Sequence, residues 1–347
     1  PRAAARSLDA AARIAEEIGA DDLRGEVWSY LGFILGVSLE RGGEAERLLR
    51  HTESIYERVD ASRIERARAR SRLGAVLAVQ ARHDEALALL LAAADEIRAI
   101  HGPRSTVLMS TLLVIGNVYD QRGELDQARA VYEEALAIAE AEEGGDHPDT
   151  AKMLNNLGII DKSLGRFEEA RGRFERALAI RRRVHGPRHP EVAQTLVNLG
   201  NLYTATGDYA RAIEHHDAAL GIFREVAPED SQELSRLLYN IGVVHHNERR
   251  YAEAVERYEQ ALLLAEAAFG AEHPECAYPL AGLGSALVEL GRVAQARPYL
   301  ERALAIRTRP DVPPVDLGEI RFALARALGP DEAARARALA SAARVDY

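Results

Sequence analysis

A glycine that returns every 42 residues is the feature that most constrains the fold of this chain. Seven such glycines each follow Leu or Ile, and from the second one onward alanines stand twelve and nineteen residues further on. Phased series of this kind are the signature of a repeat array, in which each repeat packs on its neighbours. The glycines are Gly32, Gly74, Gly116, Gly158, Gly200, Gly242 and Gly284, and the alanines are Ala86, Ala128, Ala170, Ala212, Ala254 and Ala296, then Ala93, Ala135, Ala177, Ala219, Ala261 and Ala303.

Each repeat predicts a helical hairpin. In residues 147–186, two segments with helical apolar periodicity flank a break at 164–166. A glycine at the break suits the left-handed conformation that ends a helix, and Pro after His in the linkers suits the first turn of the next helix. The break glycines are Gly123, Gly165, Gly207 and Gly291, the linker glycines are Gly102, Gly144, Gly186 and Gly270, and the pairs are His147-Pro148, His189-Pro190 and His273-Pro274.

The phased glycines lie inside the first helix of each hairpin, where Gly costs roughly 1 kcal/mol relative to Ala. A cost repeated at one phase needs a common cause. We expect close approach of neighbouring helix backbones, with the alanine series as the facing surface. The first repeat is the looser one, because Ala45 lies one residue out of phase.

The composition of the chain limits the kinds of structure and partner that we expect. The chain of 347 residues is 47% hydrophobic but only 5% aromatic, which favours closely packed helices over disorder. A net charge of -10 argues against nucleic acid as the partner. The single cysteine, Cys276, forms no internal disulfide and favours a cytoplasmic location. No uncharged apolar run reaches the roughly 18 residues of a membrane span, so we expect no membrane partner.

These patterns predict an all-α fold of antiparallel helical hairpins. Residues 1–20 are expected to form a half-hairpin helix before the array, residues 21–310 the seven repeats, and residues 311–347 a degenerate capping hairpin. The motifs of nucleotide-binding, hydrolase, metalloprotease and kinase sites are absent. We therefore expect no enzyme activity, no cofactor and no metal.

The repeat resembles the tetratricopeptide repeat. In residues 196–220, LVNLGNLYTATGDYARAIEHHDAAL carries LGxxY, GxYxxA and a further Ala seven residues on, and the 42-residue spacing with its His-Pro linker is similar to the kinesin light chain variety. The last hairpin resembles the terminal repeats of extensions on bacterial, notably myxobacterial, serine/threonine kinases. The resemblance implies a right-handed α-solenoid, or superhelix, that grips peptides in its concave groove.

Asparagine marks the expected groove. Asn is unfavourable inside helices, yet it recurs two residues before or one residue after the phased glycine. Stacked first helices would present these carboxamides to the backbone of an extended peptide, as the resemblance also implies. Basic residues nearby would favour acidic ligands. The candidate groove residues are Asn117, Lys152, Asn155, Asn156, Gln194, Asn198, Asn201, Arg236, Asn240 and Asn247.

The predicted function is a protein- or peptide-binding scaffold, as a regulatory part of a larger signalling protein. Three alternatives remain open at this point. The asparagines could instead hold neighbouring helices together, the chain could self-associate as a homo-oligomer, or the curved surface could sense a small ligand.

Overall fold

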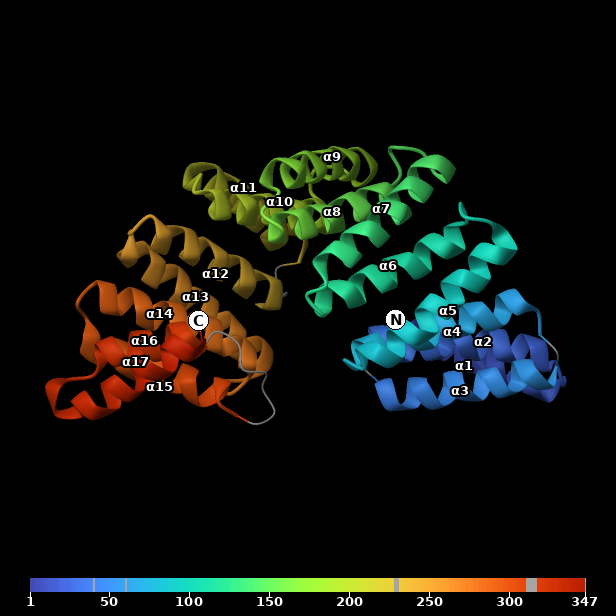
Figure 1. The fold of residues 1–347 in the computed structure, drawn as a ribbon, viewed down its shortest axis with the longest axis horizontal. Helices are drawn as coiled ribbons and strands as arrows, with labels where there is room; N and C mark the ends of the chain where they lie inside the picture. Colours follow the sequence, from blue (N-terminus) through green and yellow to red (C-terminus); the bar gives the residue numbers. More distant parts are fainter. Residues whose placement is uncertain (40, 60, 228–230, 310–316, 347) are drawn as a thin grey trace. The chain divides into compact units, whose positions relative to one another are not determined.

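The computed structural model describes residues 1–39, 41–59, 61–227, 231–309 and 317–346. All regular secondary structure in these ranges is helical, which confirms the all-α class (Figure 1). The α-helices are α1 (Arg2–Glu17), α2 (Asp21–Phe33), α3 (Gly42–Arg58), α4 (Arg63–Val79), α5 (His83–His101), α6 (Thr106–Gln121), α7 (Leu125–Glu142), α8 (Pro148–Ser163), α9 (Phe167–His185), α10 (Pro190–Thr206), α11 (Tyr209–Val226), α12 (Ser231–Asn247), α13 (Tyr251–Phe269), α14 (Ala277–Glu289), α15 (Val293–Arg307), α16 (Leu317–Ala327) and α17 (Ala333–Asp346). Three short segments are the π-helical η1 (Ile34–Ser38) and the 3₁₀-helical η2 (Pro274–Cys276) and η3 (Pro330–Glu332).

Consecutive helices pair into hairpins, among them α2 with α3, α6 with α7, α12 with α13 and α16 with α17, and α1 packs on α2. Helix α9 contacts α8 through Phe174, which lies against Gly158. Contacts divide the chain into two compact units, residues 1–180 and 181–347, with the division inside α9. The domain boundaries expected at residues 20 and 310 stay a prediction, and the second of them lies outside the described residues. No helix in the described ranges is long and apolar enough to cross a membrane.

The turn within each hairpin has the predicted backbone. Gly123, Gly165, Gly207 and Gly291 all have φ between 72° and 79°. Ala81 and Arg249 stand at the same phase with φ of 60° and 61°, so two repeats place a side chain in the left-handed region. That conformation is strained for residues with a Cβ.

The His-Pro linkers cap the next helix. Pro148 and Pro190 occupy the first turn of α8 and α10, as predicted. In addition, His147 Nδ1 accepts the backbone N–H of Asp149 at 3.3 Å, and His189 caps α10 in the same way at 3.2 Å. The sequence predicted the position of the proline, whereas the cap made by the histidine ring is seen only in the structure.

A large side chain fills the space that each phased glycine leaves, which differs from the expected contact between backbones. A Cβ on Gly116 would lie 2.6 Å from the Tyr132 ring, and one on Gly158 would lie 2.6 Å from Phe174. The residue that fills the space belongs to the second helix of the same hairpin and is Leu49, Leu90, Tyr132, Phe174, His216, Tyr258 or Leu300. Glycine is therefore needed because it leaves room for this side chain. We call the glycine position the socket and the side chain that fills it the knob.

The alanine series lies where the helices are most tightly packed. All twelve of these alanines have 0% exposure. At such positions any larger side chain would overpack the interface, so the small residue is required by volume.

The irregular first repeat has a structural cause. Its glycine and its knob, Gly32 and Leu49, are 17 residues apart, whereas the later pairs are separated by 16. The π-helical segment η1 lies between them. A π-helical turn is wider than an α-helical one and accommodates one extra residue. The insertion is absorbed there, and Ala45 still reaches full burial.

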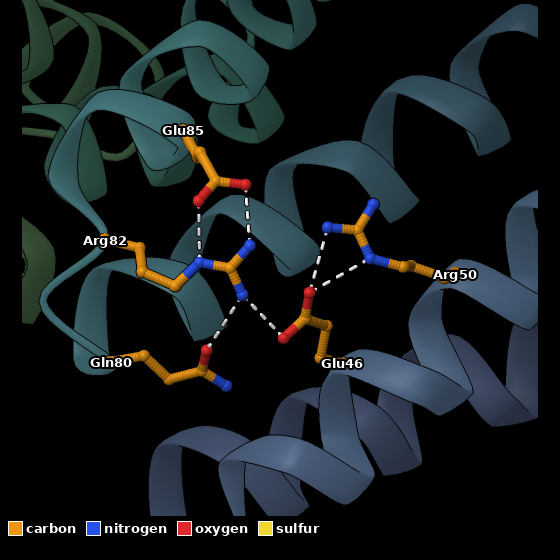
Figure 2. A network of polar contacts seen from close by, with 5 residues as sticks. All are labelled: Glu46, Arg50, Gln80, Arg82 and Glu85. Carbon is orange, nitrogen blue, oxygen red and sulfur yellow. Dashed lines mark hydrogen bonds and ion pairs between the residues drawn. The ribbon is translucent and has the colours of Figure 1, made fainter.

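Ion pairs join successive hairpins of the first unit. Arg82 lies between Glu46 and Glu85, and Arg50 contacts the other oxygen of Glu46 (Figure 2). Arg82 donates to Glu46 at 2.7 Å and to Glu85 at 2.6 Å. Desolvation raises the pKa of Glu46, but hydrogen bonds from the two arginines outweigh it, so that pKa is lowered. The second helix α3 is thereby tied to the start of α5.

Candidate functional site: a carboxamide groove in the second unit

The first helices of the second unit bring predicted residues together. Gln194, Asn198 and Asn201 follow one another at spacings of four and three in α10, which places them on one face. Arg236 and Asn240 have the same relation in α12. These five side chains line one groove of about 540 Å³, which we call the carboxamide groove.

The groove also contains residues that the sequence analysis did not select. Glu233 and Tyr239 come from α12, Glu275 from η2, and Tyr278 and Pro279 from the start of α14. Tyr239 is the one that the sequence could have indicated. The available signal was its position, three residues beyond Arg236 and one before Asn240, on the predicted groove face.

Three of the groove carboxamides are available for a ligand. Among the described residues, no hydrogen bond is made by the side chains of Gln194, Asn201 or Asn240. Asn198 does have a partner. A carboxamide offers two donor hydrogens and an acceptor oxygen, the complement of a peptide backbone.

In the first unit the same repeat positions hold the stack together. Asn117 Oδ1 accepts a hydrogen bond from the hydroxyl of the buried knob Tyr132, with 2.5 Å between the two oxygens. Burial raises the pKa of Tyr132, and a hydrogen bond with Asn156 acts in the opposite direction. The structural interpretation of the asparagines therefore applies to this pair.

His216 explains why the two units differ. Asn201 and Asn240 stand 84 residues, or two repeats, after Asn117 and Asn156, and the knob between them is His216 in place of Tyr132. His216 has 0% exposure, and neither ring nitrogen has a hydrogen-bond partner in the described structure. Without a hydroxyl at the knob, Asn201 and Asn240 remain open to the groove.

Charge in the groove does not favour acidic ligands. Arg236 lies 3.4 Å from both Glu233 and Glu275, so its guanidinium is already paired. Two carboxylates against one guanidinium leave the lining slightly negative. Arg236 is therefore not expected to give the groove a preference for acidic ligands.

The remaining candidates lie elsewhere. Lys152 is exposed and lines a separate hollow of the first unit, whereas Asn155 is buried, with 6% exposure, and has its own partner. Asn247 lines a second cavity of the second unit. None of these three residues lines the carboxamide groove.

The described residues contain one cluster of side chains that could bind a metal ion. Glu143, His147 and Asp149 form one group whose ligand atoms lie within 4.8 Å of one another. His147 Nδ1 is committed to the α8 cap and lies 2.7 Å from Glu143. These contacts serve the linker. The histidine pairs 215–216 and 245–246 form no such group in the described ranges.

Comparison with known families decides the classification. A tetratricopeptide repeat model matches residues 65–141, 108–182, 149–225 and 233–309, which is more than half of the chain. The chain belongs to the tetratricopeptide repeat family. Proteins of this family generally act as protein-interaction scaffolds. No curated protein is significantly similar to this chain.

Solved tetratricopeptide repeat structures share the fold. BtubC (BKLC) from P. vanneervenii is 26% identical with a TM-score of 0.56, covering 67% of this chain and 93% of its own. TPR-like repeats described as a kinesin light chain from Podosopora anserina are 20% identical with a TM-score of 0.50, covering 60% and 98%. A Rap protein complexed with Competence and Sporulation Factor is 15% identical with a TM-score of 0.63, covering 93% and 87%. The similarity to kinesin light chain repeats is thus confirmed, along with the α-solenoid class.

Proposed function

We propose that this tetratricopeptide repeat protein is a non-catalytic module that binds an extended peptide in the carboxamide groove of its second unit. The observation that carries the proposal is that Gln194, Asn201 and Asn240 line one groove of about 540 Å³ and that their carboxamides have no partner among the described residues. Each can pair with a peptide N–H or C=O group whatever the ligand's side chains are. Affinity would come from the backbone and selectivity from the pockets beside Tyr239 and Tyr278.

The fold supports a binding role over catalysis. In the described second unit, none of the groove residues places a nucleophile beside a general base. The Rap protein complexed with Competence and Sporulation Factor shares the fold, which supports ligand binding by such an array. A cytoplasmic location and attachment to a larger signalling protein, such as a bacterial serine/threonine kinase, stay predictions.

Selection from a displayed library of random peptides tests the proposal. Peptides selected on the wild type should bind the Asn201→Ala, Asn240→Ala double variant about tenfold more weakly, because each lost hydrogen bond costs roughly 0.5–1.5 kcal/mol. Gln260→Ala is the matched control, since this carboxamide lies exposed on the second helix α13. Equal binding by the double variant and the wild type, with both folded, would exclude the groove.

A further inference from the structure

A second cavity of the second unit contains a buried arginine. The cavity measures about 490 Å³, is lined mainly by α12, α14 and α16, and shares Tyr239 and Tyr278 with the carboxamide groove. Tyr258 and Phe322 add two further aromatic rings. Its volume falls within the roughly 300–1,000 Å³ of small-molecule sites.

Arg307 is the cation in this lining that has no counter-ion among the described residues. It ends α15 and has 4% exposure. Its guanidinium carbon lies 4.2 Å from the centre of the Tyr278 ring, and its Nη2 is buried with no hydrogen-bond partner in the described structure. A buried charge without a partner is unfavourable, and an anion entering the cavity would remove that cost.

A matched arginine elsewhere in the same unit shows how the fold satisfies this position. Arg181 stands three repeats before Arg307 and is also buried. Its Nη1 donates to the Thr195 hydroxyl at 2.7 Å and to the Glu191 carbonyl at 3.0 Å, and its Nε lies 3.3 Å from the Glu191 carboxylate. Arg307 has no such partners among the described residues, so its guanidinium remains available to a ligand.

The other charged groups of the cavity restrict the ligand. Arg326 is already ion-paired with Glu289. Burial lowers the pKa of His246, which favours its neutral form. Glu319 also lines the cavity and would repel a ligand with several negative charges. One negative charge opposite Arg307 and an aromatic body between the rings would match this lining.

We propose that this cavity binds an aromatic monocarboxylate, with the carboxylate on Arg307 and the ring among Tyr239, Tyr258 and Phe322. The carboxylate could belong to the C-terminal residue of a peptide or to a free aromatic acid, since both present the same group. The proposal does not depend on peptide binding in the carboxamide groove, because Gln194, Asn201 and Asn240 do not line this cavity.

Calorimetric titration with N-acetyl-L-phenylalanine, and with its C-terminal amide as the neutral match, tests the proposal. The acid should bind the wild type, and the amide should bind at least about tenfold more weakly. Arg307→Met should bind the acid more weakly than the wild type by a similar factor. Its Tm should be unchanged or higher, because the substitution removes an unpaired buried charge. Arg292→Met is the control and should retain the acid, because this exposed arginine does not line the cavity.

Several results would overturn the assignment. These are no binding of the acid, equal binding of acid and amide, or wild-type affinity in folded Arg307→Met. If that variant does not fold, Tyr278→Leu takes its place, because it removes the ring that orients Arg307 and should reduce the preference for acid over amide. An unreduced preference would then refute the proposal.

A tetrapeptide, acetyl-Ala-Ala-Ala-Phe with a free C-terminus, separates the two sources of the carboxylate. Tighter binding than N-acetyl-L-phenylalanine would support a peptide C-terminus, and equal binding would support a free aromatic acid. The Asn201→Ala, Asn240→Ala double variant should bind N-acetyl-L-phenylalanine normally, so failure of this site is distinguishable from failure of the groove.

Discussion

Replacing His216 with Phe should stabilise the second unit, with an effect that grows as the pH falls. His216 is the knob over Gly200, and its ring is fully buried without hydrogen bonds. Desolvation and, to a smaller extent, the neighbouring His215 lower the pKa of His216 from 6.5 to about 4. Phe174 occupies the equivalent socket one repeat earlier, so a phenyl ring fits this geometry.

The size of the effect follows from the two pKa values. Because the folded pKa is the lower one, the unfolded chain binds more protons between pH 6.5 and 4, and the free energy of unfolding falls as the pH drops through that window. At pH 5 the difference corresponds to about 2 kcal/mol relative to pH 8, since one pKa unit is about 1.4 kcal/mol. His216→Phe removes this loss.

Urea unfolding of the wild type and His216→Phe at pH 8 and pH 5 measures the effect directly. The advantage of the variant should be about 2 kcal/mol larger at pH 5, whereas the titration of all other groups cancels in the comparison. An advantage that is the same at both pH values would refute the reasoning, because His216 would then not be buried in its neutral form.

His216→Tyr extends this test to the groove. A tyrosine hydroxyl at this knob should reach Asn201 and Asn240, as Tyr132 reaches Asn117 and Asn156. The variant should therefore exceed His216→Phe in stability by about 1 kcal/mol and should bind groove peptides more weakly. Equal stability and equal peptide binding of the two variants would show that these carboxamides do not respond to the knob.

Three further predictions concern stability and use thermal unfolding. Gly116→Ala should lower the free energy of unfolding by about 1–3 kcal/mol, because the new Cβ would meet Tyr132 at 2.6 Å. Its control, Gly221→Ala, has open space around the new Cβ and should raise the free energy of unfolding by about 0.5–1 kcal/mol. Similar effects of the two variants would contradict the role of Gly116 as a socket. Arg249→Gly should raise it by about 1 kcal/mol by relieving the positive φ, and no gain would mean that the turn is not strained. Asp161→Asn should lower it by about 3 kcal/mol, because its fully buried carboxylate pairs with Arg129 at 3.0 Å and Arg173 at 2.5 Å; a loss below about 1 kcal/mol would refute the role of that pair.

The asparagines show how far sequence reasoning reached into the site. Helical spacing was sufficient to group Gln194, Asn198 and Asn201, because residues three and four apart share one face. It could not separate Asn201 from Asn117, which occupy the same position in different repeats. The difference arises from the knob on the neighbouring helix, which is Tyr132 in one place and His216 in the other.

The sequence by itself determined the repeat, the hairpins and their turns, because these depend on local periodicity and on the backbone freedom of glycine. Gly165, Gly207 and the His-Pro linkers could be interpreted within a few residues of chain. The tertiary structure alone decided what fills each glycine socket. It also decided which carboxamides stay unpaired, and that Arg307 is buried without a counter-ion, within the part of the chain that the structure describes. These outcomes depend on contacts between helices, where the volume and hydrogen bonds of a side chain are set by residues distant in the sequence.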